Sequence, residues 1–445
     1  MSVINVALIA LGCAKNLVDS EIISASLVAS GFKLITDPEE AEVIIVNTCG
    51  FIDSAKEESI AKILAMAQYK KKKCRALIAA GCLAQRYGEE LLAEIPELDG
   101  IFGINDLNAA VITIKQALAG KQAVYLCGEY DIPEDAPRLL STPGHTAYLK
   151  IAEGCDNHCT YCAIPAIRGP YRSRQAAAIL AEAEKLAGQG VKEINLIAQD
   201  ITLYGRDKAE NLTLPALLRR LAKIDGIKWI RLLYAYPDHI DDALLQTMAE
   251  LEKVCPYLDL PLQHGSNEIL RRMGRKLTVE KILALLDKLR RHVPGIVLRS
   301  SFIVGFPGET EADFKALLHF LQEAQLDRVG FFTYSQEEGT PAASFPEQIP
   351  EACKRERLEE AIAVQSAIVE KKQKALIGRR LEVLVDGRSA QDPNILLARS
   401  YMQAPEVDGY IRLRTTNLKT GPFLPVVIEG FEGYDLLGSP VKTEK

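Results

Sequence analysis

Three cysteines in one stretch of eight residues provide a compact set of metal ligands. Cys155, Cys159 and Cys162 have the spacing C-x3-C-x2-C. A structural zinc site requires four ligands, whereas a cubane iron–sulfur cluster bound by three cysteines keeps one iron free to bind another molecule. The motif therefore predicts a reactive iron–sulfur cluster. A zinc site with His158 as fourth ligand is the weaker alternative, because a ligand so close in sequence would strain tetrahedral geometry.

Three further cysteines follow apolar segments in the first part of the chain. Cys13, Cys49 and Cys82 come after residues 5–11, 43–46 and 76–80, which have the pattern of buried parallel strands. Ligands bind at the carboxyl edge of open α/β sheets, where such strand ends meet. The three thiols could thus form a second shared site. Local sequence alone leaves this hypothesis and three unrelated buried cysteines equally open.

The remaining cysteines have weaker claims to a functional site. Cys74 stands at the opposite end of the strand that leads to Cys82, roughly 25 Å away at ~3.3 Å per residue, so the two cannot share a metal. Cys74, Cys255 and Cys353 are expected to be small hydrophobic residues. Cys127 also follows an apolar run, and its spacing does not exclude a role.

Composition is typical of a globular protein of two to four domains. The chain has 445 residues, with 48% hydrophobic and 25% charged residues. A net charge of −6 argues against a protein whose main function is to bind nucleic acid. The sequence shows no signal peptide and no apolar run of membrane-spanning length. It therefore predicts a cytoplasmic protein without membrane association, in which the ten cysteines favour metal or redox roles over disulfides.

Three segments that differ in their pattern of apolar and polar residues predict three domains. Residues 1–140 alternate apolar runs with helical periodicity, typical of a parallel α/β sandwich. After a linker at residues 131–144, strand candidates begin near Tyr148, Glu193, Lys228, Leu258, Val297 and Val329. Six βα units predict a (βα)6 partial TIM barrel over residues 141–375. In residues 376–445, short strands at 381–385, 410–414 and 426–432 predict a small antiparallel, OB-like β-barrel.

The first motif resembles a known signature. Cys155, Cys159 and Cys162, with the aromatic Tyr161 between them, are similar to the cysteine motif of radical S-adenosylmethionine (SAM) enzymes. This resemblance implies a 4Fe-4S cluster whose open iron chelates the amino and carboxylate groups of SAM. One electron then cleaves SAM to a 5′-deoxyadenosyl radical. Such a radical can take hydrogen from a C–H bond that no general base could deprotonate, and a closed barrel protects it from water.

Residues near other barrel strand ends fit a SAM pocket of this kind. The expected SAM contacts are Tyr161, Gln199, Ser301 and Gly305. Gly305 and Gly308 would allow close approach of a ribose or adenine. An ordinary strand-to-helix turn, with Thr310 near the helix start, is the alternative explanation of these glycines. His264, after the fourth strand, is predicted to be structural and not catalytic.

The whole chain resembles the methylthiotransferase family, whose members combine scattered N-terminal cysteines, a radical SAM barrel and a small C-terminal TRAM barrel. The resemblance implies that Cys13, Cys49 and Cys82 bind a second 4Fe-4S cluster that carries sulfur. It also implies two SAM molecules per product, an electron donor and a sulfur source. No catalytic residue is predicted beyond the cluster ligands.

Three segments indicate a branch of this family. Residues 11–21, 163–169 and 404–409 resemble the branch that modifies an aspartate of ribosomal protein uS12, at its β-carbon. The alternative branch modifies an adenosine of tRNA, and Thr160 and Tyr161 fit it equally well. Residues 378–445 contain nine Lys/Arg and nine Asp/Glu. Because the segment has no excess of positive charge, it is poorly suited to bind the phosphate backbone of a nucleic acid. An electron carrier or RNA-binding module without SAM chemistry is the third hypothesis.

Overall fold

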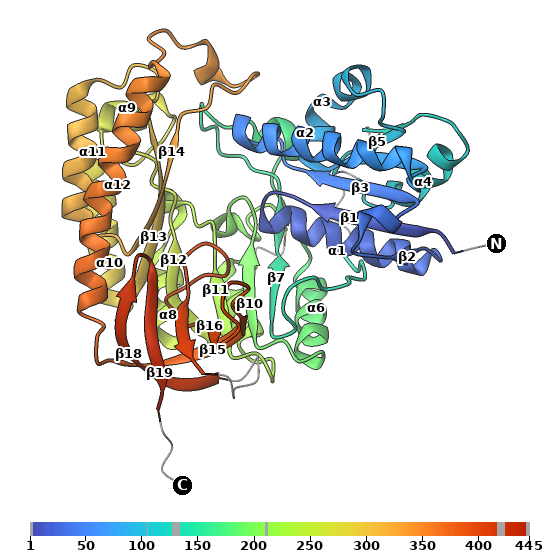
Figure 1. Ribbon diagram of the computed structural model, residues 1–445. Helices are drawn as coiled ribbons and strands as arrows, with labels where there is room; N and C mark the ends of the chain where they lie inside the picture. Colours follow the sequence, from blue (N-terminus) through green and yellow to red (C-terminus); the bar gives the residue numbers. More distant parts are fainter. Residues whose placement is uncertain (1–2, 105, 127–133, 210–211, 416–422, 442–445) are drawn as a thin grey trace.

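The computed structural model describes residues 3–104, 106–126, 134–209, 212–415 and 423–441. Within them the chain forms two six-stranded parallel sheets and one closed barrel. The N-terminal sheet lies beside the upper end of the central sheet, and the closed barrel packs against its lower end (Figure 1). The predicted fold class, parallel α/β architecture followed by a small β-barrel, is confirmed.

The N-terminal part is a three-layer sandwich with strand order β2-β1-β3-β4-β5-β6. Its strands are β1 (Asn5–Ala10), β2 (Lys33–Leu34), β3 (Val43–Thr48), β4 (Ala76–Ala80), β5 (Gly100–Phe102) and β6 (Ala123–Tyr125). Helices α1 (Ala14–Ala29) and α4 (Ala109–Leu118) cover one face, and α2 (Asp53–Ala67) and α3 (Gly81–Glu94) cover the other. Every residue of β3 and β4 is buried, because helices cover both faces of a parallel sheet.

The central sheet is an open, partial barrel with strand order β14-β13-β12-β11-β10-β7. Its strands are β7 (Thr146–Lys150), β10 (Glu193–Ile197), β11 (Trp229–Leu232), β12 (Val254–Asp259), β13 (Val297–Val304) and β14 (Arg328–Thr333). The helices outside it are α6 (Ala176–Gly188), α7 (Leu214–Leu221), α8 (Asp242–Glu250), α10 (Val279–His292), α11 (Glu311–Ala324) and α12 (Glu351–Lys374). The six predicted strands are all present. The fourth begins at Val254, four residues before the predicted start at Leu258, with Pro256 inside it.

Short elements decorate the carboxyl ends of the central strands. They are β8 (Ala152–Glu153), α5 (Ile164–Arg168), β9 (Arg172–Ser173) and α9 (Asn267–Arg272). The strands β8 and β9 pair with each other, so the loop that contains the three clustered cysteines is closed at its base by a two-stranded ribbon.

The C-terminal barrel closes in the order β15-β16-β17-β19-β18. Its strands are β15 (Arg380–Arg388), β16 (Ile395–Arg399), β17 (Ile411–Arg414), β18 (Phe423–Glu432) and β19 (Asp435–Pro440). Four pairings are antiparallel as predicted, but β17 and β19 pair in parallel. The sequence prediction contained neither β16 nor β19, so it could not include this parallel pairing.

A buried charge cluster attaches this barrel to the central sheet. Glu193, at the start of β10, accepts hydrogen bonds from Arg399 at 2.7 Å and from Arg231 at 3.0 Å. Asp386 of β15 also binds Arg399, at 2.6 Å. Glu193 and Arg231 are fully buried and Arg399 is 1% exposed, so two cations offset the buried carboxylate at the base of the sheet.

The predicted linker is held in place by both of its neighbours where the structure describes it, from residue 134 onwards. Arg138 donates to the carboxylate of Glu21 on α1, and to the Tyr148 carbonyl of β7 at 2.9 Å. Arg174 donates to the Glu134 carbonyl at 2.8 Å. Residues 131–133 lie outside the described residues. These contacts fix the N-terminal sandwich against the central sheet.

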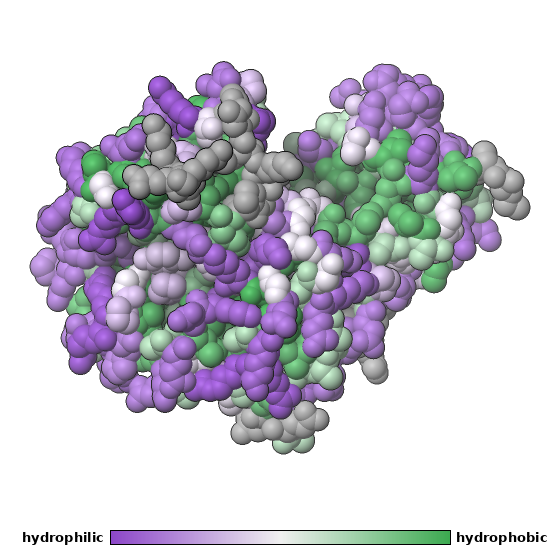
Figure 2. Space-filling view, turned by 90° about the horizontal axis from the view of Figure 1, so that it is seen from below, coloured by the Kyte–Doolittle hydropathy of each residue, from purple (hydrophilic) through white to green (hydrophobic). Residues whose placement is uncertain are grey.

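The surface differs between the two lobes. Seen from below, apolar residues gather on the N-terminal lobe, whereas the face around the C-terminal barrel is mostly hydrophilic (Figure 2). No helix within the described residues combines the length and the apolar character needed to cross a membrane.

Replacing Glu193 tests the attachment of the C-terminal barrel. Burial raises the pKa of Glu193, but Arg399 and Arg231 have the larger effect. Together they bring this pKa down from its ordinary value of 4.5 to about 2. Its contribution to stability is therefore complete above pH 4.5 and is lost as the pH falls towards 2. Glu193→Gln should cost about 3–5 kcal/mol at pH 7, because buried Arg231 loses its acidic partner and Arg399 keeps only Asp386. Calorimetry should show a lower Tm for Glu193→Gln than for the wild type. The difference in Tm between the two proteins should become smaller as the pH falls from 4.5 to 2.

Glu382→Gln is the matched control for this prediction. It removes the exposed ion pair between Lys228 and Glu382, which also joins the two parts. Exposed pairs contribute at most about 1 kcal/mol, so its Tm should stay near the wild-type value. Equal losses in the two variants would contradict the role assigned to the buried cluster.

Candidate functional site

The clustered cysteines lie in a rigid loop between β8 and α5. The Cys155 amide donates to the Gly169 carbonyl at 3.1 Å, and the Thr160 amide donates to the Met273 carbonyl at 3.0 Å. Gly274 has φ +74°, and a Cβ there would come within 2.8 Å of the His158 carbonyl oxygen. The loop is thus fixed by backbone contacts at both ends and at its centre.

Cys159 is surrounded by cationic and aromatic side chains. Its sulfur lies 3.7 Å from Nη1 of Arg275 and 3.8 Å from the Tyr236 hydroxyl. The Arg275 guanidinium stacks 3.9 Å from the centre of the Tyr236 ring. Burial raises the pKa of Cys155 to about 11 and that of Cys162 to about 12. These thiols therefore need a bound cation to ionise at neutral pH, as metal coordination provides.

The second set of cysteines meets at the carboxyl edge of the N-terminal sheet. Cys13 immediately precedes α1, Cys49 follows β3 and Cys82 lies in the first turn of α3. Gly12 has φ +87°, and a Cβ there would come within 3.1 Å of the Cys49 sulfur. The Cys82 sulfur lies 3.5 Å from Oδ1 of Asn16, on the first turn of α1. The structure thus brings together three residues that the sequence only suggested could converge.

Their ionisation depends on two cations nearby. Surrounding protein raises the pKa of Cys13, but Lys15 and Arg168 outweigh this effect and lower it. Burial raises the pKa of Cys82 to about 12 in spite of Arg168. Burial likewise raises the pKa of Cys49. The Cys13 side chain is nevertheless accessible to water, so this edge of the sheet can be reached from outside.

Arg168 reaches the N-terminal set of cysteines from the helix that follows the clustered set. It comes from α5, six residues after Cys162, and is 1% exposed. Its guanidinium donates to the Cys82 sulfur at 3.3 Å, to Asn16 at 2.7 Å and to Glu153 at 2.9 Å. The helix that follows the clustered cysteines therefore makes a direct side-chain contact with one cysteine of the N-terminal set.

Glu153 is the anionic centre of this network. Burial raises its pKa, but Arg168 and Lys150 hold that pKa well below its ordinary range. Lys150 donates to Glu153 at 2.8 Å and to Asp19 of α1 at 2.5 Å. Gln199, a predicted SAM contact, donates to Glu153 at 2.6 Å. The network thus joins the end of β10 to the N-terminal helix α1.

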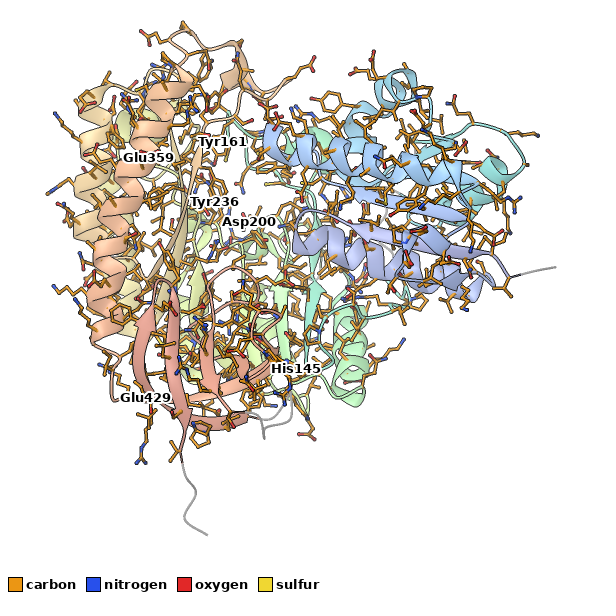
Figure 3. The ribbon with its side chains drawn as sticks, in the orientation of Figure 1. His145, Tyr161, Asp200, Tyr236, Glu359 and Glu429 are labelled. Carbon is orange, nitrogen blue, oxygen red and sulfur yellow. The ribbon has the colours of Figure 1, made fainter. Side chains whose placement is uncertain are left out.

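The other predicted SAM contacts lie in different parts of the central domain. Tyr161 packs beside Phe306 and Tyr334, and Figure 3 shows it on the same side of the central sheet as Tyr236 and Asp200. Ser301 is part of β13. Gly305 has φ +72°, and a Cβ there would come within 2.3 Å of the Lys354 side chain. The absence of a side chain at Gly305 is thus explained by packing, and its contact with SAM stays a prediction.

His264 has the surroundings of a structural histidine. His264 is fully buried, bonded to Glu309 at 3.2 Å and to the Ser266 amide at 3.0 Å, as a structural histidine would be. Within the described residues, no three Cys, His, Asp or Glu side chains surround a single-ion site. Zinc ligands at about 2.3 Å from one ion lie roughly 4 Å apart, whereas each cysteine of a cubane binds its own iron. Each donor set has three thiols, which fits an iron–sulfur cluster with one open iron better than a closed, four-ligand zinc site.

The remaining cysteines do not join either set where the structure describes them. Cys74 and Cys255 are buried and Cys353 is half-buried on α12. Cys127 lies outside the described residues.

Sequence reasoning missed Arg168, Lys15 and Tyr234. Lys15 is 7% exposed, and its Nζ lies 3.2 Å from the centre of the Tyr234 ring. Tyr234 has φ +64°, an uncommon conformation for a bulky residue that often marks a functional loop. Proximity to Cys13 in sequence was the one available signal for Lys15.

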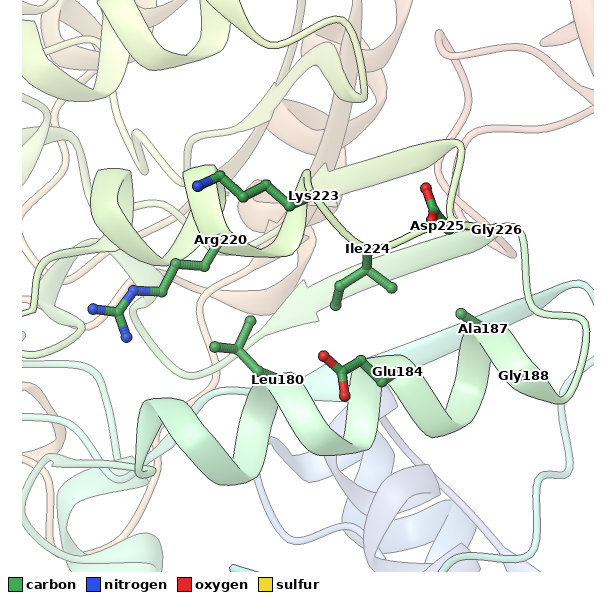
Figure 4. Close-up of a pocket in the computed structure, with 9 residues that line it drawn as sticks. All are labelled: Leu180, Glu184, Ala187, Gly188, Arg220, Lys223, Ile224, Asp225 and Gly226. Atoms are coloured by element: carbon green, nitrogen blue, oxygen red, sulfur yellow. The ribbon is translucent and has the colours of Figure 1, made fainter.

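A surface pocket elsewhere has no connection with these residues. It lies between α6 and α7 and is lined by Leu180, Glu184, Ala187, Gly188, Arg220, Lys223, Ile224, Asp225 and Gly226 (Figure 4). None of the cysteines or predicted SAM contacts lines it.

Comparisons with known proteins agree with the geometry. Models of the radical SAM superfamily, the TRAM domain and the uncharacterized protein family UPF0004 match residues 149–321, 377–441 and 5–103. Curated proteins of Desulforamulus reducens and Geobacter sulfurreducens, both named ribosomal protein uS12 methylthiotransferase RimO, are 49% and 48% identical to this chain. The alignments cover 98% and 97% of this chain and 99% and 98% of those proteins.

This chain belongs to the RimO family. The predicted membership among radical SAM methylthiotransferases is therefore confirmed, and these relatives favour the uS12 branch over the tRNA branch. Among solved structures, the radical SAM methyltransferase TsrM of Kitasatospora setae gives a TM-score of 0.58 at 14% identity, over 84% of this chain and 90% of that chain. The cobalamin-dependent enzyme OxsB gives 0.53 at 14% identity, over 83% and 56%. These two likenesses show the fold alone.

Gly12→Ala tests the N-terminal thiol set of this RimO family member. A Cβ at Gly12 would press on Cys49 at 2.8 Å from its Cβ, and so should displace one thiol. We expect the reconstituted variant to bind fewer irons per chain than the wild type, because one of three converging thiols is displaced. Iron and sulfide analysis of anaerobic protein measures this.

Gly31→Ala is the matched control. Gly31 has φ +86°, nearly the same as Gly12, but a Cβ there meets nothing within 4 Å. Both variants carry the same backbone strain of about 1–2 kcal/mol. Equal iron contents in the two variants would contradict the close approach of Gly12 to a cluster ligand.

Proposed function

We propose that this chain transfers a methylthio group to the β-carbon of an aspartate in ribosomal protein uS12. The names of the RimO relatives support this substrate. The observation that carries the proposal is the contact of Arg168 with Cys82, 86 positions away in the sequence. Because Arg168 follows the clustered cysteines by six residues, this contact supports the proposal that both thiol sets serve one substrate carbon.

Six cysteines would hold the cofactors. The ligands of one 4Fe-4S cluster, with SAM on its open iron, are Cys155, Cys159 and Cys162, and those of the second are Cys13, Cys49 and Cys82. When bound, these groups supply the electron that cleaves SAM and the sulfur that is transferred. An external electron donor and a sulfur source would then be partners, and two SAM molecules would be used per product. We assign these roles to domains at residues 1–140 and 141–375.

The surrounding residues of the chain orient and shield this chemistry. Arg275, stacked on Tyr236, places a positive charge beside Cys159. Arg168 places another beside Cys82. Both cations would offset the negative charge that three thiolates bring to each site. Their burial excludes water, which strengthens these interactions and protects a radical.

The C-terminal barrel, residues 376–445, is better suited to a protein partner than to tRNA. Its Arg399 pairs with Asp386, and its Arg412 pairs with Glu432 at 2.7 Å. Paired arginines are less available for phosphates. The tRNA adenosine reaction remains the second candidate, supported only by Thr160 and Tyr161. A ribosomal substrate would place the enzyme in the cytoplasm.

Cys82→Ala and Cys159→Ala separate the two halves of the proposed reaction. Cys159→Ala should abolish cleavage of SAM to 5′-deoxyadenosine, because the SAM-binding cluster loses a ligand. Cys82→Ala should still cleave SAM but transfer no methylthio group to uS12. Each variant should keep about four irons per chain. Chromatography of 5′-deoxyadenosine and mass spectrometry of uS12, with tRNA nucleosides measured in parallel, provide the readouts.

Cys353→Ala serves as the control, because Cys353 is a half-buried thiol of α12 outside both sets. It should keep about eight irons and full transfer. Methylthio transfer by Cys82→Ala would refute the sulfur-carrying role of the N-terminal set. Modification of a tRNA nucleoside in place of uS12 would establish the second candidate.

A further inference from the structure

The N-terminal sandwich is attached to the central sheet at both edges of that sheet. The strand order runs from β14 to β7, so these two strands are the edges of the open barrel. At the β7 edge, Lys150 of that strand donates to Asp19 of α1 at 2.5 Å. At the other edge, the loop that follows β14, residues 334–340 (the β14 loop), contains Glu337, which binds two cations of the sandwich. The sandwich therefore bridges the two edges that a closed barrel would have joined.

Glu337 is a buried carboxylate with partners in both parts of the molecule. Its side chain is 1% exposed. One carboxylate oxygen accepts from Lys56 of α2 at 2.9 Å and from Arg86 of α3 at 2.7 Å, and the other accepts from the Ser335 hydroxyl at 2.6 Å. The Asp53 amide, at the start of α2, donates to Ser335 at 3.1 Å. A buried carboxylate requires such partners, so the pairing of Glu337 holds α2 and α3 against the β14 loop.

Arg86 connects this contact to the N-terminal thiol set. Besides Glu337, its guanidinium donates to the Gly50 carbonyl at 3.1 Å and to the Glu338 carbonyl at 2.5 Å. Gly50 directly follows Cys49 in the sequence. Because one planar guanidinium binds all three groups, the position of Gly50 is tied to that of the β14 loop.

Arg86 also lies close to Cys82 along the chain. The beginning of α3 contains Cys82 and ends in a kink at Tyr87, where the backbone leaves helical geometry with φ −132°. Arg86 is the residue before this kink. A Cβ on Gly50 would come within 3.1 Å of the Cys82 carbonyl carbon, so the segments that contain Cys49 and Cys82 pack closely together. A shift of Arg86 would therefore displace two of the three thiols.

We propose that Glu337, through Arg86, positions the N-terminal thiol set relative to the SAM-binding set and so couples SAM cleavage to methylthio transfer. This inference rests on the proposed function. Contacts at the β7 edge alone would allow the sandwich to tilt about that edge, whereas a second attachment at the β14 edge fixes its orientation. Glu337 is a positioning residue, because it acts on the thiols through Arg86.

The ratio of SAM cleavage to methylthio transfer tests this role. Anaerobic holoenzyme is supplied with SAM, dithionite and uS12, and 5′-deoxyadenosine and modified uS12 are quantified in the same samples. Glu337→Gln should cleave SAM at the wild-type rate but lose about tenfold or more of the transfer rate, since a misplacement of about 1 Å can cost about 100-fold. Arg86→Lys keeps a positive charge for Glu337 but loses the fork that reaches Gly50. It should therefore show the same uncoupling with a smaller change to the buried charges.

Glu338→Gln is the matched control, because Glu338 is the exposed neighbour of Glu337. Its contact with Arg86 is made by the main-chain carbonyl, which the substitution keeps. The ratio of cleavage to transfer in Glu338→Gln should therefore equal that of the wild type.

Iron content separates positioning from cluster assembly. Glu337→Gln and Arg86→Lys should both keep the iron content of the wild type. A loss of iron, an equal loss of cleavage and transfer, or a wild-type ratio in both variants would each overturn the inference, as would the same uncoupling in Glu338→Gln. Wild type that cleaves SAM without modifying uS12 would instead overturn the proposed function.

Discussion

The buried guanidinium of Arg168 is the interaction on which the arrangement of the site depends. A cation this deep is stable only if it is paired and hydrogen-bonded. Its partners are Cys82, Asn16 and Asp19 of the N-terminal sandwich, and Glu153 of the two-stranded ribbon beside the central sheet. If the lobes separated, Arg168 would lose its contacts with Cys82, Asn16 and Asp19. The requirement to satisfy one side chain therefore holds two distant sets of thiols against each other.

The same principle operates at both ends of the central sheet. At its base, Glu193 is the buried anion that binds Arg231 and Arg399 and attaches the C-terminal barrel. Near its carboxyl ends, Glu153 binds Lys150 and Arg168 and attaches the N-terminal sandwich. The central strands thus act as a rigid spacer between two charge clusters.

Local chemistry explains what could be predicted from the sequence. A few neighbouring residues define each local feature: the strand ends that lead to Cys13, Cys49 and Cys82, and the compact motif that begins at Cys155. The resemblance to a known family then indicated that these features belong to one enzyme. The role of Arg168 could not be predicted, because its bond to Asn16 spans 152 positions and no periodicity reports it. Gly305 is a case in which the sequence allows two explanations. A glycine at this strand end is expected in a ligand-binding loop, and it is equally expected where the chain packs closely against a side chain such as Lys354.

The central claim is that the two thiol sets hold clusters close enough to serve one substrate carbon. Electron paramagnetic resonance of reduced, reconstituted protein tests it most directly. Because paired spins at short range couple magnetically, the wild-type spectrum should differ from the sum of the spectra of two variants that each lack one thiol set. A wild-type spectrum equal to that sum would show two independent, distant clusters and would contradict the account.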